Sequence, residues 1–552
     1  MTEKAKTYWS AWNGDGFGDA FGGGFGLGFG YPGGASSGAM LNRTRSLASA
    51  ALLSALLAVG TPPSARAMDL HVSSNGNDRA DGRSPRTAWR TLERVNRHIR
   101  TSALRPGDRI LLESGARFHG SLLLADAGGG TPESPVVIAS VGSRPARIEV
   151  PEGTGILVRE TPWVTVSNLV LVGTGAGGGD GIRFDRLRPS TNRIAGVTIV
   201  DCRVEGFDWH GIMIDASQRE LGYEQVLVRR VHARRNRHAG IQVYGGNQTG
   251  RRSRPHARVR IEDCLAEDNL GDPDLFEHHS GSGIFVDGVD GVRISGCVAR
   301  GNGGQCRSQQ GGPVGLWLHA CRDGVVEANE SHGNGSLLRD GGGFDLDAGC
   351  EDCVLRRNFS HDNRGPGFLV YTYTGAAYSD RGCRVTGNVS IRDGAPGTGY
   401  GGIQLGSEEG RQIEDLEVAH NTVIAGPGSI ATLRIQGHGV RSRITRNLFL
   451  PADHGAMTSL SGFDHQLEFD GNHGWRRDGR AVHVVDGSWV VSRLAQWRNS
   501  TGPEKRFRVL EESFGDPGLR WSLPKPARGS PAAVRWPRIL MSRTLNVGAP
   551  AD

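Results

Sequence analysis

Lysine is almost missing from this 552-residue chain: only Lys4, Lys6, Lys505 and Lys525 are present, all close to its two ends. A mechanism that needs a central lysine as a base or a Schiff-base former is therefore disfavoured. Beyond the first 67 residues no window has about eighteen apolar residues in a row, so no membrane span is predicted. The formal net charge of +6 does not require a nucleic-acid partner. With 84 Gly and only 6 Met, the composition suits a turn-rich β protein better than a helical one.

Two segments precede the part of the chain that can fold. Residues 1–39 are rich in glycine and aromatic residues and cannot bury a core. We interpret them as lying upstream of the true start at Met40, with a genuine disordered leader as the alternative. Residues 40–67 have the pattern of a signal peptide, with arginines, an apolar stretch and a small-x-small motif at Ala65–Ala67. The sequence thus predicts an exported protein, secreted or periplasmic, that begins near Met68.

One phrase recurs through the middle of the chain: a glycine, then apolar, variable, apolar and variable residues. The copies start 24 to 43 residues apart, at Gly155, Gly181, Gly211, Gly240, Gly283, Gly315, Gly343, Gly367 and Gly402. Because side chains alternate across a strand, the apolar residues of each copy face one side and the variable residues face the other. The repeat predicts a solenoid of strands, each with one buried face.

A second strand follows each copy and ends at a position that repeats along the chain. That position holds Cys202, Val231, Cys264, Cys297, Asn329, Asn358, Asn388, Asn421 and Asn447, and the position five residues later holds Asn236, Asn269, Asn302, Asn334 and Asn363. Stacked asparagines can pass amide hydrogen bonds from coil to coil. The helical period of 3.6 and the four-stranded unit of a propeller are both missing, which leaves a parallel β-helix.

These features resemble the pectate-lyase-like group of secreted right-handed parallel β-helix proteins, over residues 68–450. The segment that begins at Leu70, with the apolar stripe Leu92, Val95 and Ile99, resembles the amino-terminal capping helix of that group. The resemblance implies an all-β, right-handed parallel β-helix solenoid of about ten coils with an N-terminal cap. The tail, residues 451–552, is expected to pack on the β-helix.

The cysteines fit a structural role better than a catalytic one. Cys202, Cys264 and Cys297 share the inward column of the asparagine ladder. Cys353 and Cys383 occupy equivalent places on adjacent coils, about 4.8 Å apart by strand spacing. In an oxidising compartment this pair can close a disulfide.

The variable positions of the repeat stack into two outward columns that carry chemistry. Asp287, His319 and Asp347 are expected in line on consecutive coils, about 4.8 Å apart, with Asp345 beside Asp347 on one strand. We predict Asp345, Asp347 and Asp287 as acid or base residues and His319 in support. Predicted substrate-binding residues are Trp317, Phe285, Tyr371, Tyr244, Gln404 and Arg307. For isolated carboxylates such as Asp185 and Asp215, a merely solvated surface is the preferred interpretation.

This mixture of residues suits a polysaccharide, because sugar rings present apolar faces to aromatic rings and hydroxyls to carboxylates. Two carboxylates roughly 6.5–9.5 Å apart can flank a glycosidic bond and a water molecule. We therefore predict a glycoside hydrolase that needs no cofactor. The acids resemble the cluster of the polygalacturonase-like hydrolases of the same fold, although the Arg-x-Lys motif and the Asp-Asp doublet are missing from the corresponding region.

Two other functions stay open. A polysaccharide lyase would hold Ca²⁺ on Asp287, Asp345 and Asp347 and would use Arg307 or Arg339 as the base. A non-catalytic glycan-binding surface protein would use the same face for binding alone, since one fold hosts many functions.

Overall fold

The computed structural model describes residues 67–174, 177–246, 253–376, 378–453, 455–462 and 465–476, and short stretches between 481 and 541. The predicted leader, the signal segment up to residue 66 and most of the tail lie outside the described residues. Within the described part, no helix is both long enough and apolar enough to cross a membrane.

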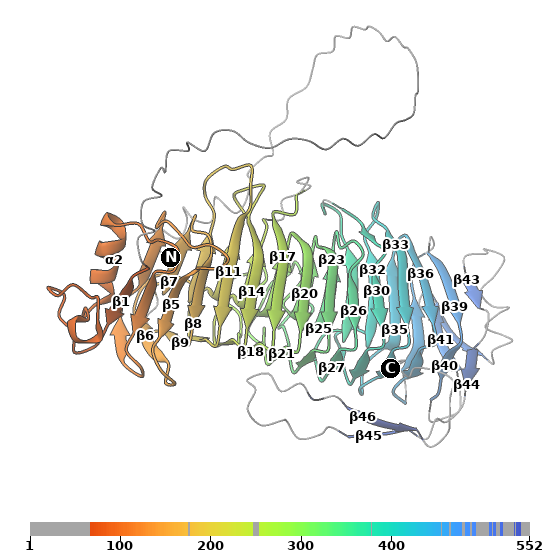
Figure 1. Ribbon diagram of the computed structural model, residues 1–552. Coiled ribbons are helices and arrows are strands. Elements are labelled where there is room, and N and C mark those ends of the chain that lie inside the picture. The colour runs from red at the N-terminus through yellow and green to blue at the C-terminus, as the bar shows by residue number, and fades with distance from the viewer. Residues whose placement is uncertain are drawn as a thin grey trace, which may run out of the picture. The chain divides into compact units, whose positions relative to one another are not determined.

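The chain coils through three parallel sheets, and each strand pairs with the strand one turn further on (Figure 1). The solenoid makes about 11 turns, one more than predicted, because the first coils precede the first copy of the glycine phrase. In order, the first sheet contains β1 (Asp69–Val72), β2 (Arg109–Leu112), β5 (Val136–Ser140), β8 (Val164–Ser167), β11 (Ile194–Val200), β14 (Tyr223–Arg229), β17 (His256–Glu262), β20 (Val289–Ser295), β23 (Arg322–Glu327), β26 (Val354–Arg356), β30 (Arg384–Thr386), β33 (Ile413–Ala419), β36 (Val440–Thr445), β39 (Gln466–Asp470) and β43 (Phe507–Val509), with β29 (Asp380–Arg381) beside β33.

The second sheet is built from the glycine phrases. It contains β4 (Leu122–Ala125), β7 (Ile156–Arg159), β10 (Ile182–Asp185), β13 (His210–Asp215), β16 (Ala239–Tyr244), β19 (Ser282–Asp287), β22 (Val314–His319), β25 (Gly342–Asp347), β28 (Phe368–Thr372), β32 (Ile403–Ser407), β35 (Ala431–Gly437), β38 (Ala456–Leu460), β41 (Ala481–Val485) and the antiparallel β42 (Ser488–Ser492).

The third sheet is made of short strands. It contains β3 (Arg117–His119), β6 (Ala146–Val150), β9 (Leu169–Gly173), β12 (Arg203–Glu205), β15 (His232–Arg234), β18 (Leu265–Glu267), β21 (Val298–Arg300), β24 (Glu330–His332), β27 (Phe359–His361), β31 (Val389–Ile391), β34 (Thr422–Ile424), β37 (Leu448–Leu450), β40 (Asn472–Gly474) and β44 (Glu512–Phe514). A separate antiparallel hairpin joins β45 (Leu519–Ser522) to β46 (Arg538–Met541).

The predicted register of the second sheet is confirmed. In β22, Leu316 and Leu318 are fully buried in the main core, whereas Trp317 packs in a separate outer cluster. Register matters because a slip by one residue would exchange the core face and the outer face of every strand. The side chains of Trp317 and His319 therefore project from the outside of the solenoid.

Both predicted asparagine ladders are present. The Asn358 amide nitrogen donates to Val326 O at 2.8 Å, and its Oδ1 accepts from the backbone and side chain of Asn329. The ladders also extend beyond the asparagines that the repeat suggested, to Asp393 and Asn472.

The cap and the cysteines complete the core. Helix α2 (Leu92–Thr101) starts at Thr91, whose hydroxyl accepts from Arg94 N at 3.2 Å, and it buries Leu92, Val95 and Ile99 as predicted. Cys353 and Cys383 are buried free thiols in this structure, so the disulfide suggested for them is not formed here.

Candidate active site

Two carboxylates share the outer face of β25. Asp345 and Asp347 alternate with the core residues Phe344 and Leu346, so both project from the solenoid. Asp345 is only 3% exposed, and its Oδ1 is buried without a hydrogen-bond partner. Burial, reinforced by the neighbouring Asp347, raises the pKa of Asp345 well above its ordinary value. Burial also raises the pKa of Asp347, to about 6, although the charge of His319 works against it.

His319 lies between two carboxylates, as predicted. In the sheet register it pairs with Asp287 on one side and with Asp347 on the other. Its Nδ1 is 2.7 Å from Asp287 Oδ1, and its Nε2 is 3.0 Å from the Tyr373 hydroxyl. Burial alone would lower the pKa of His319, but the hydrogen bond and charge of Asp287 outweigh burial and raise it.

Asp287 differs from the other two predicted acids. Its Oδ1 holds His319, and its Oδ2 accepts from Gly245 N at 3.0 Å. Both carboxylate oxygens are thus engaged, which suits a group that orients the imidazole rather than one that exchanges protons with a substrate.

Two more buried carboxylates lie near the pair on β25. Asp340 accepts from the Tyr400 hydroxyl at 2.9 Å, and burial raises its pKa. Asp380 accepts from Cys350 N at 2.8 Å, its Oδ2 has no hydrogen-bond partner, and burial raises its pKa well above the ordinary value. Both charges contribute to the raised pKa of Asp345, so the acids form one electrostatic unit.

The predicted aromatic platform is covered. The rings of Phe285 and Trp317 stack with centroids 3.9 Å apart, and His279 lies edge-on to Trp317 at 4.9 Å. Trp317 is 4% exposed, and its Nε1 donates to Ser282 Oγ at 3.2 Å. The insertion that carries His279 therefore packs against Trp317 and Phe285 and occupies the face that a sugar ring would need.

The other predicted binding residues differ in their accessibility. Tyr371 lies opposite Asp347 in the register and is half-buried, and Tyr244 is half-buried beside Phe285. Gln404 is buried, whereas Arg307 is exposed on its insertion. The structure brings Tyr371 to the acids, and the binding roles of all these residues stay predictions.

Upstream on the same face, the carboxylates are neutralised by arginines. Arg159 donates to both oxygens of Asp185 at 2.8 Å, and Arg183 pairs with Asp180 and Asp215. These ion pairs give Asp185 and Asp215 a structural role and separate them from the acids of β25.

The three acids that the lyase alternative would use to bind Ca²⁺ are not arranged as a ligand group. In the described residues, the group whose donor atoms all lie within 4.8 Å of one another is Glu330, His332 and His361 on the third sheet. Asp287, Asp345 and Asp347 do not form such a group in this part of the chain. Asp287 Oδ1 already bonds to His319 Nδ1 at 2.7 Å, which disfavours Asp287 as a calcium ligand.

A shallow groove of about 620 Å³ lies on the first sheet, whereas the acids lie on the second. Its arginines Arg258, Arg260 and Arg293 are each within ion-pair distance of a glutamate. We place the candidate site at β25 because the perturbed carboxylates are there.

Comparison with known proteins supports the fold. A family model described as a right handed beta helix region matches residues 191–423, the coils that carry Asp287, His319 and Asp347. The chain is a right-handed parallel β-helix. The fold implied by the resemblance to the pectate-lyase-like group is thereby confirmed. No curated protein matches the sequence.

Several solved structures are similar to this β-helix at low identity. The native lacto-N-biosidase of Eubacterium ramulus is 18% identical, with 73% of this chain and 68% of that chain covered and a TM-score of 0.48. The mannuronan C-5 epimerase A-module of Azotobacter vinelandii is 17% identical, with 65% and 90% covered and a TM-score of 0.47. A pectate lyase is 13% identical, with 68% and 78% covered and a TM-score of 0.37.

Sequence reasoning missed Tyr373, Asp340, Tyr400 and Asp380. Tyr373 had a usable signal, because it follows Tyr371 by two residues and therefore continues the outward alternation. Asp340 and Tyr400 lie in loops between strands and Asp380 begins the short strand β29 outside the repeat, so no periodicity places these side chains.

Proposed function

We propose that this chain is an exported glycoside hydrolase that cleaves an extracellular polysaccharide with inversion, with Asp345 as general acid and Asp347 as general base. The observation that carries the proposal is a pair of carboxylates on one strand face, Asp345 buried and Asp347 half-buried, both with raised pKa but to different extents. Two carboxyl groups whose environments separate their pKa values can divide the acid and base roles at one pH.

The roles follow from the two environments. Asp345, whose pKa burial and neighbouring carboxylates raise well above the ordinary value, is the acid suited to hold a proton and donate it to the leaving glycosidic oxygen. Asp347, with a pKa of about 6, is ionised above that pH and can accept a proton from the attacking water. Side chains two residues apart on one strand face are about 7 Å apart, near the lower end of the spacing in inverting enzymes.

His319 supports the base. Its positive charge lowers the pKa of Asp347, and Asp287 holds its ring in place at 2.7 Å. The Tyr373 hydroxyl lies 3.0 Å from His319 Nε2, so polar contacts run from Asp287 through His319 to the half-buried Tyr373. We assign Asp287 and His319 to positioning, with Asp345 and Asp347 as the groups that move protons.

The charge of the site favours a neutral sugar. The charges of Asp347, Asp340 and Asp380 all raise the pKa of Asp345, and His319 and Arg339 offset those of Asp347 and Asp340 only in part. A uronate carboxylate would add another negative charge to this unit at a cost. A neutral polysaccharide, whose hydroxyls bind carboxylates and whose ring faces contact Tyr371, suits the site better.

A polysaccharide lyase is the second candidate, and the contact between His319 Nε2 and the Tyr373 hydroxyl favours it. Such a pair can abstract a proton next to a uronate carboxyl and pass it on. We rank it second because the acids on β25 are surrounded by further carboxylates, Asp340 and Asp380, whereas a lyase must neutralise the uronate with a cation or a metal ion.

One assay separates these functions. The purified chain is incubated with a panel of neutral and uronate polysaccharides, and reducing ends and ultraviolet absorbance are followed together. New reducing ends without new absorbance, on a neutral glycan and with inverted anomeric configuration by NMR, are the expected result. Unsaturated products would identify a lyase, retention would contradict the assigned roles, and glycan binding without products would identify a binding protein.

A further inference from the structure

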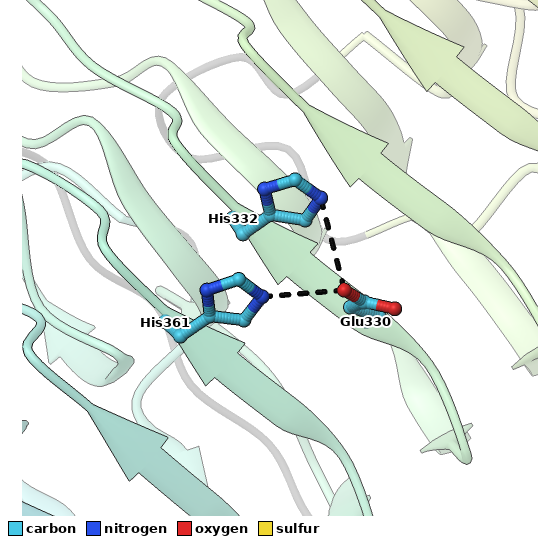
Figure 2. Close-up of side chains that lie close together, drawn as sticks. All are labelled: Glu330, His332 and His361. Carbon is cyan, nitrogen blue, oxygen red and sulfur yellow. Dashed lines mark hydrogen bonds and ion pairs between the residues drawn. The ribbon is translucent and has the colours of Figure 1, made fainter. Parts of the chain in front are cut away.

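A second cluster of functional side chains lies on a different sheet. Glu330 and His332 project from the outer face of β24, and His361 projects from β27, opposite His332 in the register (Figure 2). Both imidazoles present Nε2 to one carboxylate oxygen, Glu330 Oε1, at 3.2 Å from His361 and 3.7 Å from His332. The hydrolase proposed above uses none of these residues.

We propose that Glu330, His332 and His361 bind one divalent transition-metal ion of the zinc type. Two imidazoles and one carboxylate are a ligand set that zinc and similar ions take, with a further position left open. Ligand atoms around a tetrahedral ion at about 2.1 Å lie about 3.4 Å from one another. The distances of 3.2 and 3.7 Å from the shared oxygen bracket that separation.

The ligands are held in place by the fold. The rings of His332 and His361 are stacked with centroids 4.5 Å apart and an interplanar angle of 9°, because strand pairing sets the step between coils. His361 Nδ1 bonds to Asp362 Oδ2 at 2.7 Å, and Arg392 holds that carboxylate at 2.6 and 2.7 Å. A carboxylate behind a histidine in this way fixes the ring and directs Nε2 to the metal.

A cation already occupies the position that the metal would take. The guanidinium of Arg535, from the C-terminal part of the chain, donates to Glu330 Oε1 at 2.6 and 2.8 Å, and its Nη2 lies 3.2 Å from His332 Nε2. The backbone nitrogen of Arg535 donates to Glu330 Oε2 at 2.6 Å. The Glu330 side chain is 1% exposed, so its charge requires a positive partner. Since Arg535 and a metal ion need the same oxygen, they compete for it.

Metal binding therefore requires that Arg535 leave. The side chain of His332 is 21% exposed, the most open of the three, and offers the route by which an ion enters. Occupation by zinc would free the C-terminal segment from the third sheet, and occupation by Arg535 would hold it there. The site thus links metal binding to the attachment of the chain's C-terminal segment.

Zinc titration of the untagged full chain, stripped of metal, tests the proposal by calorimetry. The parent should bind one equivalent of Zn²⁺, and His332→Ala or His361→Ala should weaken binding by at least about 10-fold. Arg535→Gln should strengthen it by at least about 5-fold, because it removes the competing charge. His119→Ala is the matched control, since His119 on the same sheet faces a lone glutamate at 3.5 Å and lacks a second histidine. It should bind zinc like the parent.

Thermal unfolding distinguishes a loss of zinc binding from a loss of folding. Zinc should raise the melting temperature of Arg535→Gln more than that of the parent, because the buried Glu330 then depends on the metal for its positive partner. Absence of stoichiometric zinc binding in the parent would overturn the proposal. So would full affinity in both histidine variants, or weaker binding and a smaller thermal shift in Arg535→Gln.

Discussion

At the scale of single residues, burial and charge decide what each acid of the second sheet can do. Asp185 has the same place in the repeat as Asp347, but Arg159 neutralises it through two hydrogen bonds. No arginine of the described part of the chain is paired with Asp347, and burial raises the pKa of Asp347 to about 6. The same residue type on the same face thus stabilises the fold on one coil and offers proton transfer on another.

Asp345→Asn and Asp347→Asn should each lower the rate of hydrolysis by at least about 10²-fold, because asparagine keeps the shape of the side chain but cannot transfer the proton. Glycan binding should largely survive. Initial rates on a cleaved polysaccharide, with affinity measured separately, check this. The exposed Asp323→Asn on the first sheet is the control and should leave the rate unchanged. Full activity in both site variants would place the chemistry elsewhere.

The pKa of Asp347 predicts a pH dependence for both rate and stability. The rate should rise as the pH increases through about 6, as Asp347 loses its proton. The folded pKa lies above the ordinary 3.8, so the folded state holds this proton more tightly than the unfolded chain. The stabilisation is therefore complete below about pH 4 and is lost as the pH rises to about 6.

Urea unfolding of the parent and of Asp347→Asn across this range measures the effect. The free energy of unfolding of the parent should fall relative to that of the variant between the two pH values. A constant difference between them would mean that Asp347 titrates normally in the folded protein.

At the scale of elements, the coils are joined by ladders that satisfy buried polar groups. Each ladder asparagine donates to a backbone carbonyl and to the next ladder side chain, and accepts from the preceding one. Asn388 Nδ2, for example, donates to Leu355 O at 2.8 Å and to Asn421 Oδ1 at 3.1 Å, and Asn388 Oδ1 accepts from Asn358 Nδ2 at 3.1 Å. Because each member serves two coils, a single substitution affects both of them.

Asn358→Ala should lower the free energy of unfolding by roughly 1–3 kcal/mol, since Val326 O and the two amide groups of Asn329 lose their partner inside the core. Chemical denaturation of the purified variant measures the change. Substitution of Asn75, an exposed residue before the cap, is the control and should have little effect. A neutral result for Asn358→Ala would mean that water replaces the amide.

At the scale of the whole molecule, the ends of the solenoid determine what it needs to fold. Helix α2 closes the first coils with Leu92, Val95 and Ile99, which covers core that an open coil would expose to water. In the C-terminal part of the chain, the Arg535 side chain bonds to Glu330 on the third sheet, and the packing of residues 451–552 as a whole stays a prediction.

If the chain is exported as proposed, the mature protein should begin near Met68. The Met68 backbone nitrogen lies 2.7 Å from Asp108 Oδ1, so a new amino terminus at this residue would be paired with a buried carboxylate. Amino-terminal sequencing or intact mass of the exported chain checks the position. Retention of residues 1–39 in that material would contradict both the signal peptide and the start at Met40.

Sequence alone determined the periodic part of this protein. Alternation inside each glycine phrase predicted the strands, the inward column and the line of Asp287, His319 and Asp347. In a parallel sheet, residues at equivalent positions of successive repeats become neighbours on adjacent strands. Tertiary structure decided everything that depends on segments between the repeats. His279 covers Trp317, Arg535 reaches Glu330 and Asp380 joins the acids, because turns and insertions have no period to predict their paths. The tertiary structure also decides the pKa values of the acids, since burial and neighbouring charges arise only once the coils and their insertions have packed.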